Sequence, residues 1–375
     1  MDFTYDEEQR AVADLARKIF AQRVTQTALR ATEAEADRFD RSLWKDLAEA
    51  GLLGVSIPVE HGGSGHGLLP LAALLVEAGA VTAHVPLWAT LVLGAAAIDA
   101  FGSEAQKREI LPRVAGGDCL LAAALVETKS EDPEAPTTTA RKDGDEWVLD
   151  GEKTCIAAGH VAERILVAAR TGNGTLGVFL VDPTARGVTL DRQIVTNDSV
   201  EARLTMTGVR VSRASVLGDP TAGLAIVRFL VARGLAGLCA LELGVAERAL
   251  QMSATYTSSR EQFDRPIATF QAVAQRLADA YIDLECVRLA TWRAVYCLHA
   301  GLPAEAALAT AKFWASEGGH RVVLAAQHVH GGMGYDRDYP LFRHYTWSRH
   351  LELTLGGATR QLVRLGELIA SSEER

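Results

Sequence analysis

The feature of this sequence that most constrains its fold is a change of hydrophobic pattern, from helical to β-rich and back to helical. Apolar residues recur at helical spacing in the first and last thirds of the chain. The middle third contains short runs of β-forming residues, separated by turn sequences such as Asp143-Gly144 and Asp182-Pro183. The pattern predicts a mainly helical α+β protein with an N-terminal helical domain at 1–117, a middle antiparallel β-domain at 118–220 and a C-terminal four-helix bundle at 221–375.

Local signals predict where individual helices begin and which faces they bury. Thr4 with Glu7 indicates a capping box that opens the first helix, and Ser103 is a candidate N-cap of a later one. The first helix is expected to bury Val12, Leu15, Ala16 and Ile19. A second helix is expected at 43–50, and the four long helices of the C-terminal part are expected at 224–258, 269–298, 303–329 and 341–370.

Composition limits the classes of function. The 375 residues carry a formal net charge of −9 without a basic face, which argues against non-specific nucleic-acid binding. The best apolar stretch, 87–97, has about half of the roughly 20 residues that a membrane-spanning helix requires. The five cysteines are scattered, the histidines show no metal-ligand spacing, and no leader is expected at 1–3. A cytoplasmic protein with reduced thiols, no metal and no membrane contact is therefore expected.

Two sequence clusters stand out from this background. The first begins at Arg260 with the sequence REQFDRPI, and the second begins at His328 with the sequence HVHGGMGY. Either cluster alone is compatible with an ordinary helix end, marked by a proline or a glycine turn. Together, joined by two predicted helices, they closely resemble the acyl-CoA dehydrogenase family. The helix–β–helix order and the glycine-rich loop at 57–65 agree with this resemblance, which extends over essentially the whole chain.

The resemblance implies that both clusters bind FAD across a subunit interface. Arg260 is then the arginine that meets the FAD pyrophosphate, because a planar guanidinium fork matches phosphate oxygens. Gln262 and Phe263 lie beside it, and the aromatic ring covers the adenosine end of the cofactor. The first cluster therefore supplies three candidate cofactor contacts.

The second cluster supplies the remaining candidate contacts. Gly331 and Gly332 let the backbone approach the cofactor without a Cβ in the way. In the family, a glutamine stands three residues before the first of these glycines. This chain has His328 at that position and Gln327 one residue earlier, so both are candidate hydrogen-bonding partners of FAD.

The family's catalytic base is missing from the positions at which the resemblance places it. In the family, a glutamate near the C-terminus removes the α-proton of the acyl-CoA thioester. Here Leu355 stands at that position, or Gly356 if the sequence is shifted by one residue. Some members carry the glutamate early in the first C-terminal helix, where this chain has Gly234. Glu352 and Glu242 are the alternative bases, although each is also interpretable as a surface or helix-pairing acid.

The middle part of the sequence also departs from the family's flavin-binding segments. Within the stretch 126–133, only Glu127 matches the family's Thr-Glu-Pro loop. Gly151-Glu152-Lys153 is kept, but Cys155-Ile156-Ala157 replaces the Trp-Ile-Thr/Ser segment that follows in the family. The resemblance implies that the chain lacks an aromatic wall and a hydroxyl contact for its own flavin ring.

The differences from the family are therefore uneven. The chain keeps the Arg260 and Gly331 motifs, which the family contributes to a neighbour's FAD. It lacks the catalytic glutamate and the segment that contacts its own flavin ring. We expect a base-less subunit that completes the FAD site of a homologous catalytic partner in the α,β-dehydrogenation of an acyl-CoA thioester, with an electron-transfer acceptor for the reduced flavin. The sequence resembles actinobacterial members that form α2β2 heterotetramers acting on steroid-type acyl-CoAs. The alternatives are a self-sufficient homo-oligomeric enzyme that uses Glu352 or Glu242, and a non-redox acyl-CoA-binding scaffold.

Overall fold

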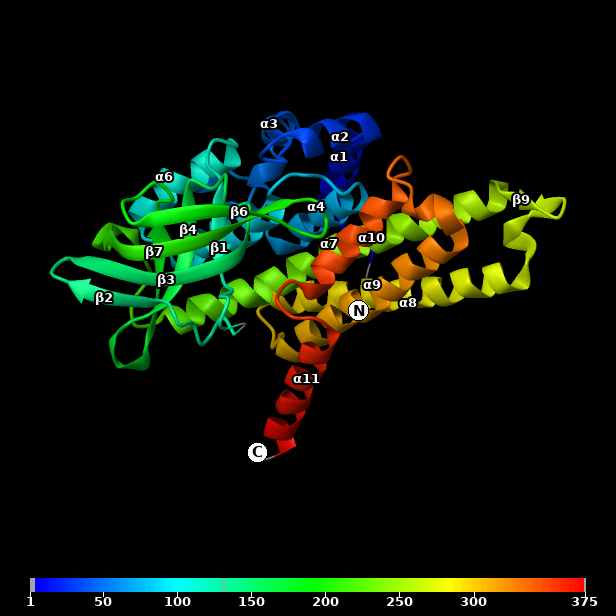
Figure 1. Ribbon diagram of the computed structural model, residues 1–375. Coiled ribbons are helices and arrows are strands. Elements are labelled where there is room, and N and C mark those ends of the chain that lie inside the picture. Colours follow the sequence, from blue (N-terminus) through cyan, green and yellow to red (C-terminus); the bar gives the residue numbers. More distant parts are fainter. Residues whose placement is uncertain (1–3, 131, 374–375) are drawn as a thin grey trace. The chain divides into compact units, whose positions relative to one another are not determined.

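The computed structural model describes residues 4–130 and 132–373 (Figure 1). The leader expectation at 1–3, and residue 131 of the stretch compared with the family above, lie outside the described residues. The chain forms two compact units. The first comprises the described residues of Met1–Ala31, Leu68–Ala83 and Leu235–Arg375, and the second those of Thr32–Gly67 and His84–Gly234. The domain boundaries near 117 and 220 stay a prediction.

The second unit is built around an eight-stranded sheet with the order β6-β7-β3-β2-β4-β5-β8, in which β1 also pairs with β4. Its strands are β1 (Leu121–Ala124), β2 (Thr139–Asp143), β3 (Glu146–Ala157), β4 (Arg164–Arg170), β5 (Leu176–Val181), β6 (Val188–Ile194), β7 (Val200–Ser212) and β8 (Val216–Leu217). Most neighbours run antiparallel, but β1 is parallel to β4. The sheet is therefore mixed, whereas the sequence analysis expected an antiparallel one. The parallel pair β1 and β4 needs a long connection, and the β2–β3 hairpin lies within it.

Alternating apolar residues of these strands form the core of the sheet. Leu149, Val167, Phe179 and Leu204 are fully buried there. The helical segments of this unit are α3 (Arg41–Glu49), the π-helical segment η3 (Trp88–Ala95), α5 (Ala96–Phe101) and α6 (Glu104–Ala115). Ser103 caps α6 in a reciprocal capping box with Gln106, which confirms the predicted N-cap.

The first unit is a helical bundle. Its helices are α1 (Glu7–Arg23), α4 (Leu68–Ala80), the part of α7 (Gly223–Ser259) from Leu235 onward, α8 (Gln271–His299), α9 (Glu305–His330), α10 (Leu341–Leu353) and α11 (Ala358–Glu373). Helices α8, α10 and α11 pack against α9, and α1 packs against α4. Figure 1 shows α7 and α8 side by side, joined at their far ends by the short hairpin β9 (Glu261–Gln262) and β10 (Arg265–Pro266).

Two glycines bring α4 and α7 into backbone contact within this unit. A Cβ added at Gly79 would lie 2.1 Å from the carbonyl oxygen of Leu241, and a Cβ at Gly244 would lie 1.9 Å from that of Val76. Neither distance leaves room for a side chain, so the close crossing depends on both glycines. The crossing fixes α7 in the centre of the bundle, where it carries Glu242.

Three expectations about helices were wrong, and one helix was not expected at all. The first helix is capped by Asp6 with Gln9, not by Thr4 with Glu7, because the Asp6 carboxylate accepts from the Gln9 amide at 2.8 Å. Leu15 is exposed, and Phe20 is buried instead. The sequence also missed helix α2 (Gln26–Ala34). The single helix expected at 341–370 is two helices, α10 and α11, separated by a turn at 354–357.

Helix α7 is more apolar than the sequence analysis expected. Among the described residues it is long and apolar enough to cross a membrane by length and composition, with mean hydropathy 1.9 over 18 residues. The stretch 87–97 is therefore not the best apolar run, and that expectation was wrong. Because 61% of the apolar window is buried inside the protein, α7 has the character of a core helix.

Candidate functional site

The first sequence cluster forms the tip of the α7–α8 pair. The β9–β10 hairpin pairs Gln262 with Arg265, which leaves Phe263 and Asp264 as the two central turn residues. Their φ angles are +56° and +62°. A two-residue turn with both residues left-handed suits glycine or asparagine, and a phenylalanine there is strained. The Phe263 side chain is 85% exposed, so the strain presents an aromatic ring to the surroundings.

Arg260 lies at the end of α7, directly before this hairpin. Its amide donates to the Tyr256 carbonyl at 2.8 Å, and its carbonyl accepts from Ile267 at 2.8 Å, which fixes the backbone on both sides. The side chain is exposed, and its guanidinium makes no ion pair or hydrogen bond with any residue that the structure describes. Gln262 is also exposed, and its amide donates only to the neighbouring Glu261 carbonyl. The tip therefore offers an unneutralised fork of donors for an anion.

The second cluster forms the end of α9 and the turn η7 (Gly331–Tyr335). Gly331 has φ +58° and ψ −137°, a backbone conformation that glycine alone adopts readily. Gly332 is exposed, and a Cβ added there would meet nothing within 4 Å in this chain. The backbone conformation at position 331 therefore requires a glycine. At position 332, the packing of the described residues does not.

The two candidate donors before these glycines point in different directions. His328 is exposed, whereas Gln327 is buried, with 2% of its surface accessible. The Gln327 Oε1 atom faces Gly334, where an added Cβ would lie 2.5 Å away, and it has no hydrogen-bond donor among the described residues. At the surface of this turn, His328 is therefore the exposed candidate and Gln327 is an interior residue.

The turn between α10 and α11 contains the predicted base position and no carboxylate. Leu355 has φ +58° and Gly356 has φ +91°, so two consecutive residues are left-handed. The buried Gln361 side chain donates to the Gly356 carbonyl at 3.2 Å. The other predicted base position, Gly234, is buried in the second unit, where its carbonyl accepts from the Trp88 indole at 3.0 Å.

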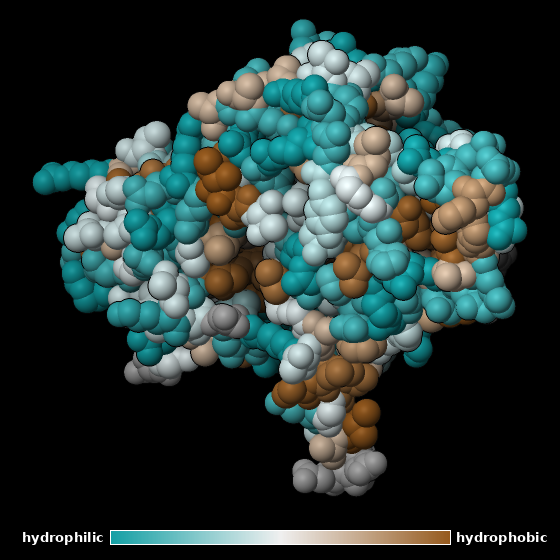
Figure 2. Space-filling model, turned by 45° about the vertical axis from the view of Figure 1, so that its right-hand side comes forward, coloured by the Kyte–Doolittle hydropathy of each residue, from teal (hydrophilic) through white to brown (hydrophobic). Residues whose placement is uncertain are grey.

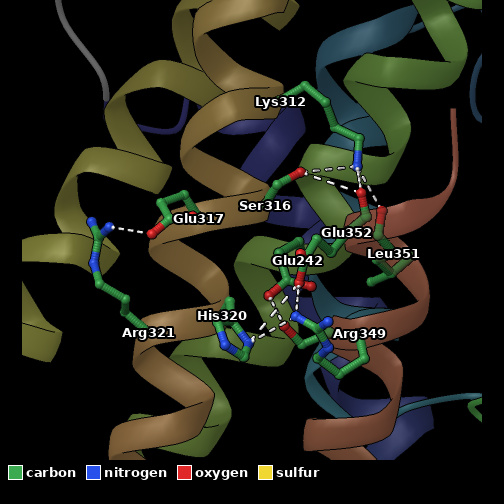
Figure 3. Close-up of polar contacts among 10 residues, drawn as sticks. Glu242, Lys312, Ser316, Glu317, His320, Arg321, Arg349, Leu351 and Glu352 are labelled. Atoms are coloured by element: carbon green, nitrogen blue, oxygen red, sulfur yellow. Dashed lines mark hydrogen bonds and ion pairs between the residues drawn. The ribbon is translucent and has the colours of Figure 1, made fainter. Parts of the chain in front are cut away.

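Lys312 of α9 binds the end of α10 that leads into this turn (Figure 3). The sequence analysis did not identify this residue. Its buried ammonium donates to the Leu351 carbonyl at 2.6 Å, the Glu352 carbonyl at 3.0 Å and the Ser316 hydroxyl at 3.3 Å. Burial lowers the Lys312 pKa to about 8. The cation lies at the C-terminus of α10, where the helix dipole favours positive charge and the last carbonyls need donors.

The two alternative bases are both engaged inside the bundle (Figure 3). The Glu352 carboxylate pairs with Arg349 on the same helix and lies 4.0 Å from His320. Glu242 is 1% exposed and accepts from the Ser348 hydroxyl at 2.7 Å, while its other oxygen has no donor among the described residues. Burial raises the Glu242 pKa to about 8.

Glu242 occupies a space that a glycine leaves for it. A Cβ added at Gly319 of α9 would lie 2.3 Å from the Glu242 Oε1 atom. The carboxyl group is therefore enclosed by α9 and by Ser348 of α10, and its raised pKa follows from that enclosure. A raised pKa alone is a weak sign of catalysis, because a base must also reach its substrate.

In the second unit, Glu127 anchors a loop. It accepts from Lys153 at 2.8 Å and from the amides and hydroxyls of Thr137 and Thr138. Burial would raise the Glu127 pKa, but these hydrogen bonds outweigh burial and lower it to about 2. Cys155 is exposed with φ +51°, at an irregularity in the β3–β7 pairing. Glu127 is thus a structural residue, although the family comparison drew attention to it.

Comparisons with known proteins identify the family of the chain. Family models match 6–118 (acyl-CoA dehydrogenase, N-terminal domain), 124–211 (middle domain) and 222–367 (C-terminal domain). Acyl-CoA dehydrogenase FadE27 of Mycobacterium tuberculosis is 38% identical, with 99% of this chain and 100% of that protein covered.

Two solved structures are similar over nearly the whole chain. A variant of the steroid acyl-CoA dehydrogenase Tcur3481-Tcur3483 is 42% identical with TM-score 0.92, covering 98% of this chain and 99% of that one. The ChsE4-ChsE5 complex from Mycobacterium tuberculosis is 38% identical with TM-score 0.93, covering 99% of both chains. With family models over all three regions and these full-length relatives, the chain belongs to the acyl-CoA dehydrogenase family of FAD-dependent oxidoreductases.

Proposed function

We propose that this chain is the base-less subunit of a heteromeric acyl-CoA dehydrogenase and completes the FAD site of a homologous catalytic subunit. The observation that supports this most is the contrast within the first unit. An exposed tip carries an unpaired Arg260 and a strained, exposed Phe263, whereas the base position at Leu355 or Gly356 has no carboxylate. Removal of an α-proton by a general base contributes roughly 10²–10⁴-fold to a rate, so this chain alone lacks an essential group.

The exposed residues of the α7–α8 tip and of the Gly331 turn would fit one edge of FAD. Arg260 would hold the pyrophosphate with its free donors, Phe263 would cover the adenosine end, and His328 would donate a hydrogen bond. Gly332 would allow backbone approach, because none of the residues that the structure describes fills the space of its missing Cβ. When bound, FAD supplies the acceptor for the substrate's β-hydrogen and its electron pair, while a carboxylate of the partner takes the α-proton.

The relatives favour a partner of the same family. Two of the similar solved structures are described as pairs of differently named proteins, Tcur3481-Tcur3483 and ChsE4-ChsE5, and the first is described as a steroid acyl-CoA dehydrogenase. We extend both features to this chain: an α2β2 assembly, and a steroid-type acyl-CoA thioester as substrate. A cytoplasmic location and a separate electron-transfer acceptor for the reduced flavin complete the proposal.

Exposed apolar side chains of the first unit offer surfaces for such a partner. On α11, Leu362, Val363 and Ile369 are 50–57% exposed, and Figure 2 shows apolar atoms along this helix at the lower edge of the view. On α8, Tyr281 and Ile282 are also exposed. Apolar side chains left in water on two helices are typical of an assembly surface.

The test is to purify the chain alone and with a co-expressed family member that contains the C-terminal glutamate. We expect little flavin and negligible acyl-CoA dehydrogenation from the isolated chain, and a yellow, active complex. Arg260→Ala in this chain should weaken FAD binding by the complex roughly 10- to 100-fold, the range for loss of a hydrogen bond to a charged group. Arg293→Ala, at an exposed arginine on α8 away from the tip, is the matched control.

The alternatives give different results in the same experiment. A self-sufficient enzyme would bind FAD as the isolated chain and lose turnover with Glu242→Gln or Glu352→Gln. A non-redox scaffold would give complexes without flavin, and Arg260→Ala would have no effect on the partner. Strong dehydrogenase activity of the isolated chain would contradict the proposal.

A further inference from the structure

A cluster of three aromatic side chains lies beneath the two cofactor motifs of the first unit. His330, the last residue of α9, stacks on Tyr256 of α7 with ring centroids 4.3 Å apart and an interplanar angle of 21°. Tyr339, which follows the turn η7, contacts both rings, with centroids 5.2 Å from His330 and 6.4 Å from Tyr256. None of the three residues belongs to the set that would touch FAD.

The hydrogen bonds of His330 assign its tautomer. Its Nδ1 atom lies 2.8 Å from the Ala326 carbonyl oxygen, which can only accept, so Nδ1 carries the proton. Its Nε2 atom is then an acceptor and takes the hydrogen bond of the Tyr339 hydroxyl at 3.1 Å. His330 is 4% exposed, and burial lowers its pKa, which favours this neutral form. All polar atoms of the imidazole are thus used within the cluster.

The cluster connects the two motifs through the backbone. The carbonyl of Tyr256 accepts from the amide of Arg260 at 2.8 Å, one turn along α7. His330 directly precedes Gly331, at which the backbone leaves the helix with φ +58°. The stack between Tyr256 and His330 therefore joins the helix turn that carries the arginine to the residue that begins the glycine turn.

We propose that Tyr256, His330 and Tyr339 are positioning residues that hold the Arg260 tip and the Gly331 turn in one fixed relation, so that the affinity of the complex for FAD depends on Tyr339. This inference rests on the proposed function, because it needs FAD to bind both motifs of this chain. Tyr339 acts through His330, whose ring the hydroxyl orients, and it makes no contact with FAD. Residues that fix the geometry of a binding group raise affinity by pre-organisation.

The experiment uses the complex with the catalytic partner and compares three single variants. Tyr339→Phe removes one hydroxyl and leaves the Nε2 acceptor of His330 without its donor. His330→Asn keeps a short donor near the Ala326 carbonyl but removes the stacked ring. Tyr296→Phe, at a 41% exposed tyrosine of α8, is the matched control. FAD dissociation constants and the thermal unfolding of the apo complex are measured for each.

We expect Tyr339→Phe to weaken FAD binding roughly three- to tenfold, the range of one neutral hydrogen bond, and His330→Asn to weaken it more. The apo complex should also unfold at a lower temperature in both variants, because each removes contacts of the buried His330 side chain, and Tyr296→Phe should change neither quantity. A double variant distinguishes positioning from general loss of stability: with Arg260→Ala present, Tyr339→Phe should have little further effect, because the group that it positions is gone.

Unchanged FAD affinity in Tyr339→Phe would overturn the inference, as would effects of Tyr339→Phe and Arg260→Ala that simply add. If the wild-type complex binds FAD and loses it with Arg260→Ala while Tyr339→Phe is silent, the proposed function stands and this inference fails. If Arg260→Ala leaves the FAD affinity of the complex unchanged, the proposed function itself fails, whatever the result for Tyr339→Phe. The two failures are therefore distinguishable.

Discussion

At the scale of single residues, two of the buried ionisable groups in the bundle, Lys312 and Glu242, differ in how many hydrogen bonds offset their burial. Lys312 donates to the Leu351 and Glu352 carbonyls near the end of α10 and to the Ser316 hydroxyl of α9, so hydrogen bonds offset part of the cost of its burial. Glu242 has one oxygen bonded to Ser348 and another without a donor among the described residues. Burial therefore favours the protonated form of Glu242, with a pKa of about 8 against an ordinary value of 4.5.

This difference predicts how stability depends on pH. Between pH 4.5 and about 8, Glu242 binds more protons when folded than when unfolded, so its contribution is fully present at low pH and is lost as the pH rises toward 8. Glu242→Gln keeps an acceptor for Ser348 and removes the titration. The free energy of unfolding of wild type relative to the variant should therefore fall from pH 5 to pH 8.

This fall in the free energy of unfolding is at most about 5 kcal/mol. The Glu242 pKa rises from 4.5 to about 8, and each unit corresponds to about 1.4 kcal/mol. Urea unfolding of both proteins at four pH values across this range measures it. A constant difference between the proteins, or a wild type that gains stability over the variant as the pH rises, would contradict the assignment. Ser348→Ala should not abolish the slope, because burial is the larger cause of the raised pKa.

The sequence analysis found residues on exposed motifs and missed those that act from the interior. Arg260, Phe263 and Gly331 were visible because their types and order are unusual. Lys312 carries no such signal, since a lysine within a helix is ordinarily exposed, and Tyr339 follows the second cluster without a role that its sequence position could assign. Only the packing of α7, α9 and α10 shows which carbonyls and rings these side chains reach.

At the scale of elements, the hairpin at the α7–α8 tip holds Phe263 in a strained backbone conformation and leaves its side chain exposed. Phe263 and Asp264 occupy left-handed turn positions that cost roughly 1 kcal/mol each in comparison with a glycine. The Phe263 ring meets the Phe270 ring edge to face, with centroids 6.1 Å apart, but it is 85% exposed, so most of its surface is available to a group outside this chain.

Phe263→Gly should therefore separate stability from cofactor binding. Relief of left-handed strain and the entropic cost of glycine are each about 1 kcal/mol or less, so thermal stability should change by no more than about 1 kcal/mol. The affinity of the complex for FAD should fall, because an aromatic surface is lost. Calorimetry and flavin titration give the two numbers; Asp264→Gly, which relieves the same strain but keeps the ring, is the control. Unchanged FAD affinity in Phe263→Gly would exclude the ring as a contact.

Element boundaries were predictable where local chemistry sets them and not where the turn is irregular. The Ser103 cap follows from a short-range hydrogen-bond pattern and is confirmed. The break between α10 and α11 interrupts a continuous apolar periodicity, and its first left-handed residue is Leu355, a type that rarely adopts that conformation. The parallel pairing of β1 and β2 with β4 was equally hidden, because strand direction depends on connections rather than on strand composition.

At the scale of the whole molecule, family models match the chain in its N-terminal, middle and C-terminal regions, and we propose that its set of catalytic residues is incomplete. The family was predictable from two motifs and their order, and family models confirm it over all three regions. The division of the active site between subunits was inferred from missing residues, and it stays a prediction. It implies that each active site uses the exposed tip of this chain and the carboxylate of another.

The measurement that tests this claim most directly is the flavin-to-protein ratio, taken from absorbance, of the chain alone and of the complex with its partner. A chain that holds half of a site should carry almost no flavin alone, and the complex should hold about one FAD per pair of chains. One FAD per chain in the isolated protein, or two FAD per pair in the complex, would contradict the account.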